Sequence, residues 1–189
     1  TPSGIEITAK APAGAFYGMQ TVLQLLPAEI ESKSVVKTDW TLPCVTIEDA
    51  PRFAYRGLMC DPCRHFMTVE EVKRQIDVMA MLKINQFHWH LTEDQGWRME
   101  IKKYPKLTEV GATRQEGEGT THSGFYTQEE MKEVVAYAAE RFITVIPELE
   151  TPGHELAAIA AYPHLSCTGE DVTPRVIWGV EDLVMCPGK

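Results

Sequence analysis

The fold is decided by residues 84–98, which read INQFHWHLTEDQGWR. The first half of this stretch is bulky and apolar, contains no helix or strand breaker, and is typical of a buried strand. Because side chains alternate faces along a strand, the histidines are expected on one face and the apolar residues on the other: His88 and His90 against Phe87, Trp89 and Leu91. The strand runs directly into two adjacent acids, Glu93 and Asp94. Buried charge is costly unless it is paired or used, so this junction is a candidate functional site; an ordinary strand-to-loop transition with solvated acids is the alternative.

Two further strands are expected to end in ionisable residues. The strand over 55–60 is followed by one polar cluster and the strand over 142–147 by another: Asp61, Arg64 and His65, then Glu148, Glu150 and His154. Amphipathic helices separate the strands, and a capping box opens each helix: Thr68 with Glu71, and Thr127 with Glu130.

Strands joined by helical crossovers run parallel, and in a (β/α)8 barrel the chemistry lies at their carboxyl ends. We therefore predict an α/β fold whose strands form a partial (β/α)8 TIM barrel. A doubly wound sheet would place ligands at the same edge, but no Gly-rich phosphate loop follows any of the strands. Three strands are fewer than half a barrel, so the barrel is expected to be incomplete in this chain.

A domain boundary is expected near residue 42. Before it, residues 3–9 alternate as a strand and residues 14–26 have the broad apolar face of a helix. After it, residues 44–48 are expected to begin the next unit. The boundary thus separates residues 1–42 from residues 43–189.

The composition argues against several classes of function. Acidic residues outnumber basic ones by 27 to 18 without a basic cluster, which argues against a nucleic-acid partner. No apolar run is long enough for a membrane span, and the chain opens without a signal-peptide pattern. The five cysteines are irregularly spaced, and the lone pair Cys60 and Cys63 lacks the second pair of a zinc ribbon. We expect all five to be reduced, part-buried thiols.

The residues 151–154, TPGH, predict the start of a helix with Thr151 as N-cap and Pro152 at the first helical position. His154 would then lie in the first turn, where the helix dipole disfavours the imidazolium, unless a carboxylate holds the charge. A histidine that can switch its charge beside Glu93 or Asp94 suits an acid/base relay. The alternative is a histidine satisfied by a backbone group.

Three further features are ambiguous from sequence alone. Arg64 suits recognition of hydroxyls or carboxylates at a barrel mouth, or a simple ion pair with Asp61. Trp97 and Trp178 could stack on sugars or lie in the core. Residues 108–125 are rich in Gly and Thr and too long for a routine connection, which predicts a functional lid or a disordered loop.

Five blocks of sequence occur in an order that is characteristic of one family: 14–21 (GAFYGMQT), 51–57 (PRFAYRG), 61–66 (DPCRHF), 88–98 (HWHLTEDQGWR) and 147–154 (PELETPGH). By these blocks the chain resembles glycoside hydrolase family 20, the β-N-acetylhexosaminidases. The resemblance covers nearly the whole chain. It implies a partial (β/α)8 TIM barrel preceded by the end of a small α+β domain: residues 1–42 would end the small domain, and residues 43–189 would begin the catalytic barrel.

The resemblance also implies a reaction and roles for particular residues. Family members release terminal non-reducing β-linked N-acetylglucosamine or N-acetylgalactosamine with retention, the substrate's own acetamido oxygen attacking the anomeric carbon. Arg64 matches the arginine that binds the ring hydroxyls. Glu93 and His154 match the supporting acid and histidine that line up behind the catalytic glutamate; the acid is often Asp, so Glu93 is a departure. Arg64, Glu93 and His154 are the expected substrate-binding set, with no metal and no cofactor.

One part of the family pattern is missing. The family's Asp-Glu pair, which orients the acetamido group and protonates the leaving oxygen, lies in a Gly-x-Asp-Glu motif, and no Asp-Glu dipeptide occurs in this chain. The chain is therefore interpreted as a portion of an enzyme that is inactive alone. Its expected partners are amino-sugar glycans and the other part of the barrel, with no nucleic acid and no membrane span. The resemblance favours a periplasmic or secreted parent protein, which the residues themselves do not specify.

Two alternatives from other classes stay open. A metal-dependent barrel hydrolase could use His88 and His90, whose spacing lets two imidazoles bind one ion, with His154 as a third ligand. A non-catalytic carbohydrate-binding module would bind amino sugars without turnover.

Overall fold

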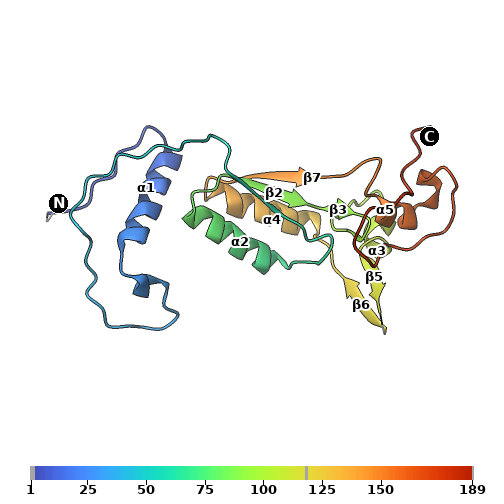
Figure 1. The fold of residues 1–189 in the computed structure, drawn as a ribbon, viewed down its shortest axis with the longest axis horizontal. Helices are drawn as coiled ribbons and strands as arrows, with labels where there is room; N and C mark the ends of the chain where they lie inside the picture. Colours follow the sequence, from blue (N-terminus) through green and yellow to red (C-terminus); the bar gives the residue numbers. More distant parts are fainter. Residues whose placement is uncertain (1–2, 118, 189) are drawn as a thin grey trace.

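The centre of the molecule is a parallel three-stranded sheet in the order β1-β2-β7 (Figure 1). The computed structural model describes residues 3–117 and 119–188. Strand β1 spans Gly57–Cys60, β2 spans Gln86–His90 and β7 spans Thr144–Glu148. In this register Met59 lies beside His88 and His88 beside Ile146. The expected parallel strands are confirmed, and their carboxyl ends meet at one edge of the sheet.

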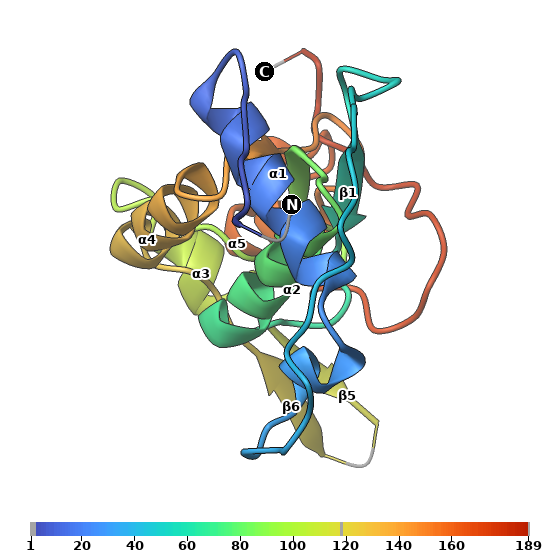
Figure 2. The same ribbon diagram turned by 90° about the vertical axis from the view of Figure 1, so that its left-hand side faces the viewer.

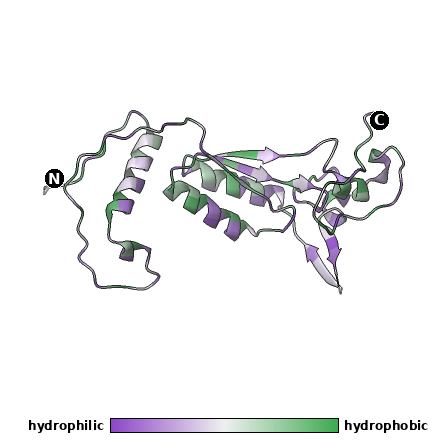
Figure 3. Ribbon diagram, viewed as in Figure 1, coloured by the Kyte–Doolittle hydropathy of each residue, from purple (hydrophilic) through white to green (hydrophobic). Residues whose placement is uncertain are grey.

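Two amphipathic helices form the crossovers, α2 (Val69–Met81) and α4 (Gln128–Ala139) (Figure 3). Each begins at a complete capping box. The Glu71 carboxylate accepts a hydrogen bond from the Thr68 backbone N–H at 2.8 Å, and the Thr68 hydroxyl accepts one from the Glu71 N–H at 3.3 Å. Thr127 and Glu130 repeat this arrangement. Both caps predicted from the sequence are confirmed, because such a motif depends only on local chemistry.

The main hydrophobic core lies between these helices and one face of the sheet. Phe87, Trp89 and Leu91 are buried there, packed against the apolar stripes of α2 and α4. On the opposite face Met59 and Ile146 are exposed. The strand thus separates its apolar and histidine-bearing faces as its alternation predicts.

The region after β2 contains short elements that the sequence did not reveal. Strands β3 (Thr92–Glu93) and β4 (Gly96–Trp97) form a tight hairpin, and helix α3 covers Lys106–Glu109. Strands β5 (Thr113–Glu116) and β6 (Thr120–Ser123) form a second hairpin.

The second hairpin contradicts the disordered loop that was one of the two expectations for residues 108–125; the other, a functional lid, stays a prediction. Both of its strands are polar on either face, so no apolar alternation marked them. Cross-strand contacts hold them instead, for example the hydrogen bond of 2.8 Å between the hydroxyls of Thr113 and Ser123. Gly117 and Gly119 at the tip have positive φ angles of 31° and 82°, which glycine adopts readily.

The N-terminal part is built around helix α1 (Pro12–Leu25), followed by the 3-10 turn η1 (Ala28–Glu31). The predicted helix is confirmed, but the strand expected over 3–9 is not formed. An extended segment becomes a strand only when a neighbour pairs with its backbone, and no such partner lies among the described residues.

Helix α1 packs on the end of the sheet layer opposite the site described below (Figures 1 and 2). The rings of Phe16 and Phe142 lie 5.5 Å apart, and the Gln24 amide donates a hydrogen bond of 2.8 Å to the Met81 carbonyl. The domain boundary near residue 42 stays a prediction. No helix among the described residues is long and apolar enough to cross a membrane.

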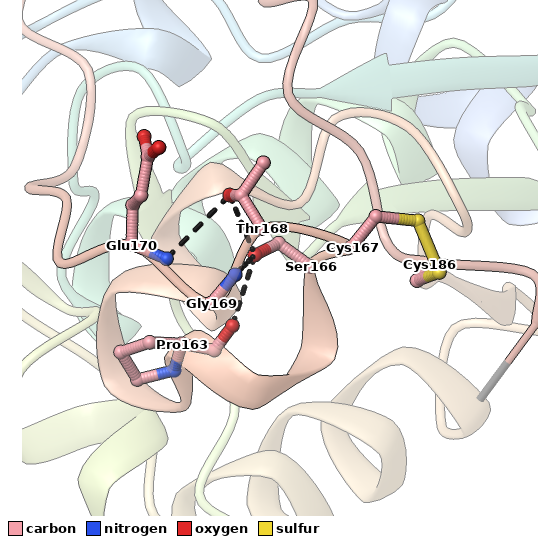
Figure 4. The surroundings of a disulfide bond; sticks show 7 residues. All are labelled: Pro163, Ser166, Cys167, Thr168, Gly169, Glu170 and Cys186. Atoms are coloured by element: carbon pink, nitrogen blue, oxygen red, sulfur yellow. Dashed lines mark hydrogen bonds between the residues drawn. A yellow bond between two sulfur atoms is a disulfide. The ribbon is translucent and has the colours of Figure 1, made fainter.

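After β7 the chain forms helix α5 (Leu156–Ala161) and the 3-10 turn η2 (Pro163–Leu165). A disulfide then joins Cys167 to Cys186 (Figure 4). The expectation that all five cysteines are reduced is therefore wrong for these two. Spacing alone could not pair them, because folding brings their Cα atoms to 4.8 Å across 19 residues of sequence. Three cysteines stay free: Cys44, Cys60 and Cys63.

Glu155, the residue before α5, is a buried carboxylic acid with 2% of its surface exposed. Its Oε2 atom has no hydrogen-bond partner among the described residues. Burial, together with the charges of Glu150, Asp94 and Glu93, raises the pKa of Glu155 to about 8. The folded protein therefore keeps this carboxyl protonated at pH values where the unfolded chain ionises it.

We expect the double replacement Cys167→Ser and Cys186→Ser to lower the free energy of unfolding by about 3 kcal/mol, because the disulfide closes a loop of this length. Denaturant unfolding of oxidised protein measures the change. Cys44→Ser, at an exposed free cysteine, is the control and should have little effect. Five titratable thiols in this chain after denaturation without reductant would contradict the disulfide.

We expect Glu155→Gln to stabilise the protein increasingly between pH 5 and pH 8. In this range the unfolded state loses the Glu155 proton and the folded state keeps it, so wild-type stability falls by up to about 1.4 kcal/mol per pH unit. Melting temperatures of the variant and wild type across this range test the effect. Glu140→Gln, at a side chain that is mostly exposed, is the matched control. A stability difference that is independent of pH would contradict the assignment.

Candidate functional site

Segments that follow the three parallel strands meet at the Glu93 side chain. Arg64 comes from the loop after β1, Glu93 from the β3–β4 hairpin after β2, and His154 from the loop after β7. Only 1% of the Glu93 surface is exposed. The structure therefore brings together the three residues that the sequence singled out, at the carboxyl edge of the sheet.

The Glu93 carboxylate accepts four hydrogen bonds or ion-pair contacts. Its Oε1 lies 2.7 Å from His154 Nδ1 and 3.0 Å from the Asp94 backbone nitrogen. Its Oε2 lies 2.8 Å from Arg64 Nη2 and 3.2 Å from His90 Nε2. Burial alone would raise the pKa of Glu93, but the His90 and Asp94 hydrogen bonds and the Arg64 charge lower it below its ordinary value. Glu93 is therefore a buried, ionised carboxylate.

Arg64 contacts the buried Glu93 carboxylate and is itself partly exposed to solvent. Its Nη1 lies 2.6 Å from Asp61 Oδ2, so the ion pair with Asp61 and the contact with Glu93 exist together. The Arg64 side chain is 42% exposed. All three guanidinium nitrogens have contacts, to Asp61, Glu93 and Gln95, and the side chain stays exposed enough for a ligand with hydroxyl or carboxylate oxygens to reach it.

His90 carries a positive charge at neutral pH. Its Nδ1 lies 2.6 Å from Glu148 Oε2, and its Nε2 faces Glu93, so both ring nitrogens can donate to carboxylates. Burial opposes the charge, but these hydrogen bonds raise the pKa of His90 to about 9. Arg64 Nη1 lies only 3.4 Å from His90 Nε2, and the carboxylates of Asp61, Glu93 and Glu148 offset this repulsion between cations.

The position of His154 corrects one expectation. It does not lie in the first turn of a helix: α5 begins at Leu156, and His154 precedes it with a positive φ of 56°. The N-terminal cap comes from elsewhere in the chain, because Asp94 Oδ1 accepts a hydrogen bond of 3.0 Å from the Leu156 N–H. A local reading of Thr151 as the cap could not anticipate a partner 62 residues away.

Asp94 is completely buried beside Glu93 and behaves differently from it. Burial raises the pKa of Asp94, and the charge of Glu93 adds to this, although the Leu156 N–H opposes it. Its Oδ2 lies 4.0 Å from His154 Nδ1. The two adjacent acids therefore have separate roles: Glu93 holds the charge, and Asp94 holds the segment that carries His154.

The structure decides two residues of the β3–β4 hairpin that the sequence left open or missed. Trp97 belongs to the second hydrophobic cluster and donates its indole N–H to the Met99 carbonyl at 2.6 Å, so it is a core residue. Gln95 is buried, and its Oε1 accepts a hydrogen bond of 3.1 Å from Arg64 Nε. In the sequence, only the position of Gln95 between Asp94 and Trp97 indicated that it could contact Arg64.

The geometry does not assemble the alternative metal site. His88 and His90 both contact Glu148 Oε2, at 2.5 and 2.6 Å, whereas His154 contacts Glu93. Clusters of described residues with ligand atoms within 4.8 Å of one another do exist, but none combines these three histidines: Asp61, Cys63 and His90; His90, Glu148 and Glu150; Glu93, Asp94 and His154.

Comparison with known proteins identifies the family. The model of the catalytic domain of glycosyl hydrolase family 20 matches residues 53–189, and the model of domain 2 of the same family matches residues 1–50. A beta-hexosaminidase of Porphyromonas gingivalis is 63% identical over 186 residues, covering 98% of this chain and 24% of the relative. A beta-hexosaminidase of Akkermansia muciniphila is 42% identical over 195 residues, covering 100% of this chain and 38% of the relative.

A solved structure agrees with these matches. A mutant beta-hexosaminidase of Streptomyces plicatus, in a complex with its product GlcNAc, superposes with a TM-score of 0.94 at 44% identity, over 100% of this chain and 37% of that one. The chain thus spans between about a quarter and two fifths of the length of these proteins. Its three-stranded unit is part of a TIM barrel, and the chain belongs to glycosyl hydrolase family 20.

Proposed function

We propose that the protein containing this chain hydrolyses terminal non-reducing β-linked N-acetylglucosamine or N-acetylgalactosamine. The proposal rests on one observation: the segments after three parallel strands bring Arg64 and His154 into direct contact with the buried carboxylate of Glu93. The relatives named beta-hexosaminidase support the same substrate class.

Each of the three side chains has a proposed role that fits its surroundings. Arg64 uses the exposed part of its guanidinium to bind ring hydroxyls of the terminal sugar. Glu93 holds Arg64 and His154 in place and keeps a negative charge behind the reacting centre. His154 is a positioning residue that aligns and tunes the acid; Glu93 fixes one of its ring nitrogens.

The reaction we propose is the substrate-assisted, retaining one. The acetamido oxygen attacks the anomeric carbon as the glycosidic bond breaks, a glutamic acid gives its proton to the leaving oxygen, and water then opens the cyclic intermediate with retained configuration. The acid and the aspartate that orients the acetamido group are assigned to a Gly-x-Asp-Glu motif outside these residues. No part of this scheme requires a metal or a cofactor.

Release of p-nitrophenol from the β-N-acetylglucosaminide and β-N-acetylgalactosaminide tests the proposal. We expect turnover by the full-length protein and none by residues 1–189 alone, because the proton donor is assigned outside this chain. Turnover by residues 1–189 would contradict that assignment. A folded full-length protein that binds N-acetylglucosamine without turnover would favour the carbohydrate-binding alternative.

We expect Glu93→Gln in the full-length protein to lower kcat about 100-fold, because the amide cannot supply the charge that Arg64 and His154 contact. Steady-state kinetics and a pH profile of kcat measure this loss. Glu93→Asp, which retains the charge, should keep most of the activity. Glu129→Gln, at an exposed helix position, is the control for an unspecific charge effect. Equal losses for the Gln and Asp variants would contradict a role for the charge.

A further inference from the structure

Arg114, on strand β5, is a buried arginine that the proposed mechanism does not use. Only 7% of its surface is exposed. Its Nη2 donates to the Arg64 carbonyl at 2.6 Å and its Nη1 to the Gln95 carbonyl at 3.2 Å. The β5–β6 hairpin lies at the same end of the molecule as β3 (Figure 1). Through this one side chain it contacts both the loop after β1 and the β3–β4 hairpin.

The two carbonyls belong to residues whose side chains also meet. Gln95 Oε1 accepts a hydrogen bond of 3.1 Å from Arg64 Nε. Arg114 therefore holds the backbone of Arg64 and the backbone of the residue that orients the Arg64 side chain. Carboxylates hold the far end of that side chain, and Arg114 holds the backbone from which it starts.

The remaining contacts of Arg114 indicate that the carbonyls set its orientation. Its charge is balanced within the hairpin by the Glu116 carboxylate, which pairs with Nη2, and this hydrogen bond lowers the pKa of Glu116. Its Nε is buried and has no hydrogen-bond partner in the part of the chain that the structure describes. A buried donor without a partner is unfavourable and needs an explanation. Here the orientation that leaves Nε unpaired is the one that brings both terminal nitrogens to the site.

His122, the cross-strand partner of Arg114, holds the same loop at a second point. Its Nε2 accepts a hydrogen bond of 2.9 Å from the Phe66 N–H, and its ring lies 4.6 Å from the ring of His65. The Arg64 carbonyl and the Phe66 N–H flank His65 in the chain. Two paired residues of the hairpin thus fix the loop on both sides of a single residue.

We propose that Arg114 is a positioning residue for Arg64, setting the place from which the Arg64 guanidinium binds ring hydroxyls of the terminal sugar. This inference rests on the proposed function and extends it to a side chain that is itself buried. A purely structural arginine would stabilise the hairpin without affecting how Arg64 binds. The two roles differ in whether the effect of Arg114 depends on the Arg64 side chain.

A double-mutant cycle in the full-length protein, with p-nitrophenyl β-N-acetylglucosaminide as substrate, tests this dependence. Arg114→Lys keeps the charge beside Glu116 but replaces the planar fork by one nitrogen, which cannot hold both carbonyls in the same geometry. We expect it to lower kcat/KM about tenfold, because a small displacement of a binding group weakens transition-state binding. In an Arg64→Ala background the same substitution should change kcat/KM by less than about twofold, since no guanidinium is left to position.

Arg141→Lys is the matched control. Arg141 also pairs with a carboxylate and donates to a backbone carbonyl, but it lies on the far side of the sheet layer, beside Asp77 and Tyr137. This variant should leave kcat/KM unchanged. If Arg114→Lys does not fold, Glu116→Ala takes its place, because it frees the Arg114 guanidinium from its carboxylate partner at a side chain that is 37% exposed. Its expected loss is about threefold and should likewise vanish in the Arg64→Ala background.

Two results overturn the positioning role: equal losses in both backgrounds, which mark a structural arginine, and no loss in either. If the wild type shows no turnover, the proposed function fails, and calorimetric titration with N-acetylglucosamine decides the positioning role separately. An affinity that falls about tenfold with Arg114→Lys, but falls no further when this change is added to Arg64→Ala, supports it. An affinity that is absent, unchanged or lowered equally in both backgrounds overturns it.

Discussion

The buried carboxylate of Glu93 is the constraint on which the site depends. An ionised group with almost no exposure is stable only if donors surround it. The structure supplies Arg64 from the loop after β1, His90 from the end of β2 and His154 from the loop after β7, together with the Asp94 N–H. Removing any one of these donors would leave charge unpaired, so the carboxylate fixes how the ends of β1, β2 and β7 approach each other. The same contacts leave the Arg64 side chain partly exposed to solvent.

A second buried ion organises the scaffold around that site. Arg98 is fully buried, and its guanidinium donates to four backbone carbonyls at 2.7 to 2.9 Å: Pro62, Cys63, Ala112 and Gly124. These carbonyls belong to the loop after β1 and to both ends of the β5–β6 hairpin. Burial lowers the pKa of Arg98 to about 10, which still leaves it charged at neutral pH. One side chain therefore joins the loop that carries Arg64 to the hairpin that follows the site.

The loop closed by the Cys167–Cys186 disulfide is hydrogen-bonded to the β3–β4 hairpin of the site, and these contacts again join residues distant in sequence. Asp94 and Gln95 form a two-residue turn in the β3–β4 hairpin, yet they anchor Leu156, Arg175 and Ile177. Because these partners are distant in sequence, the prediction that Thr151 caps a helix was wrong. For the same reason the disulfide between Cys167 and Cys186 could not be predicted from their spacing. The predicted strand over 3–9 was wrong for the complementary reason, because alternation alone supplies no neighbour to pair with.

The sequence by itself determined the parallel three-stranded unit, both capping boxes, the two faces of β2 and the candidates Arg64, Glu93 and His154. All of these follow from local chemistry or from strand and helix periodicity, which act over a few residues. Only the tertiary structure decided that Glu93 and Asp94 have different roles, that His90 is charged, that Trp97 is core and Trp178 exposed, and that polar residues 113–123 pair as a hairpin. These outcomes depend on which distant groups surround each side chain, because solvation and hydrogen bonding are set by the assembled fold.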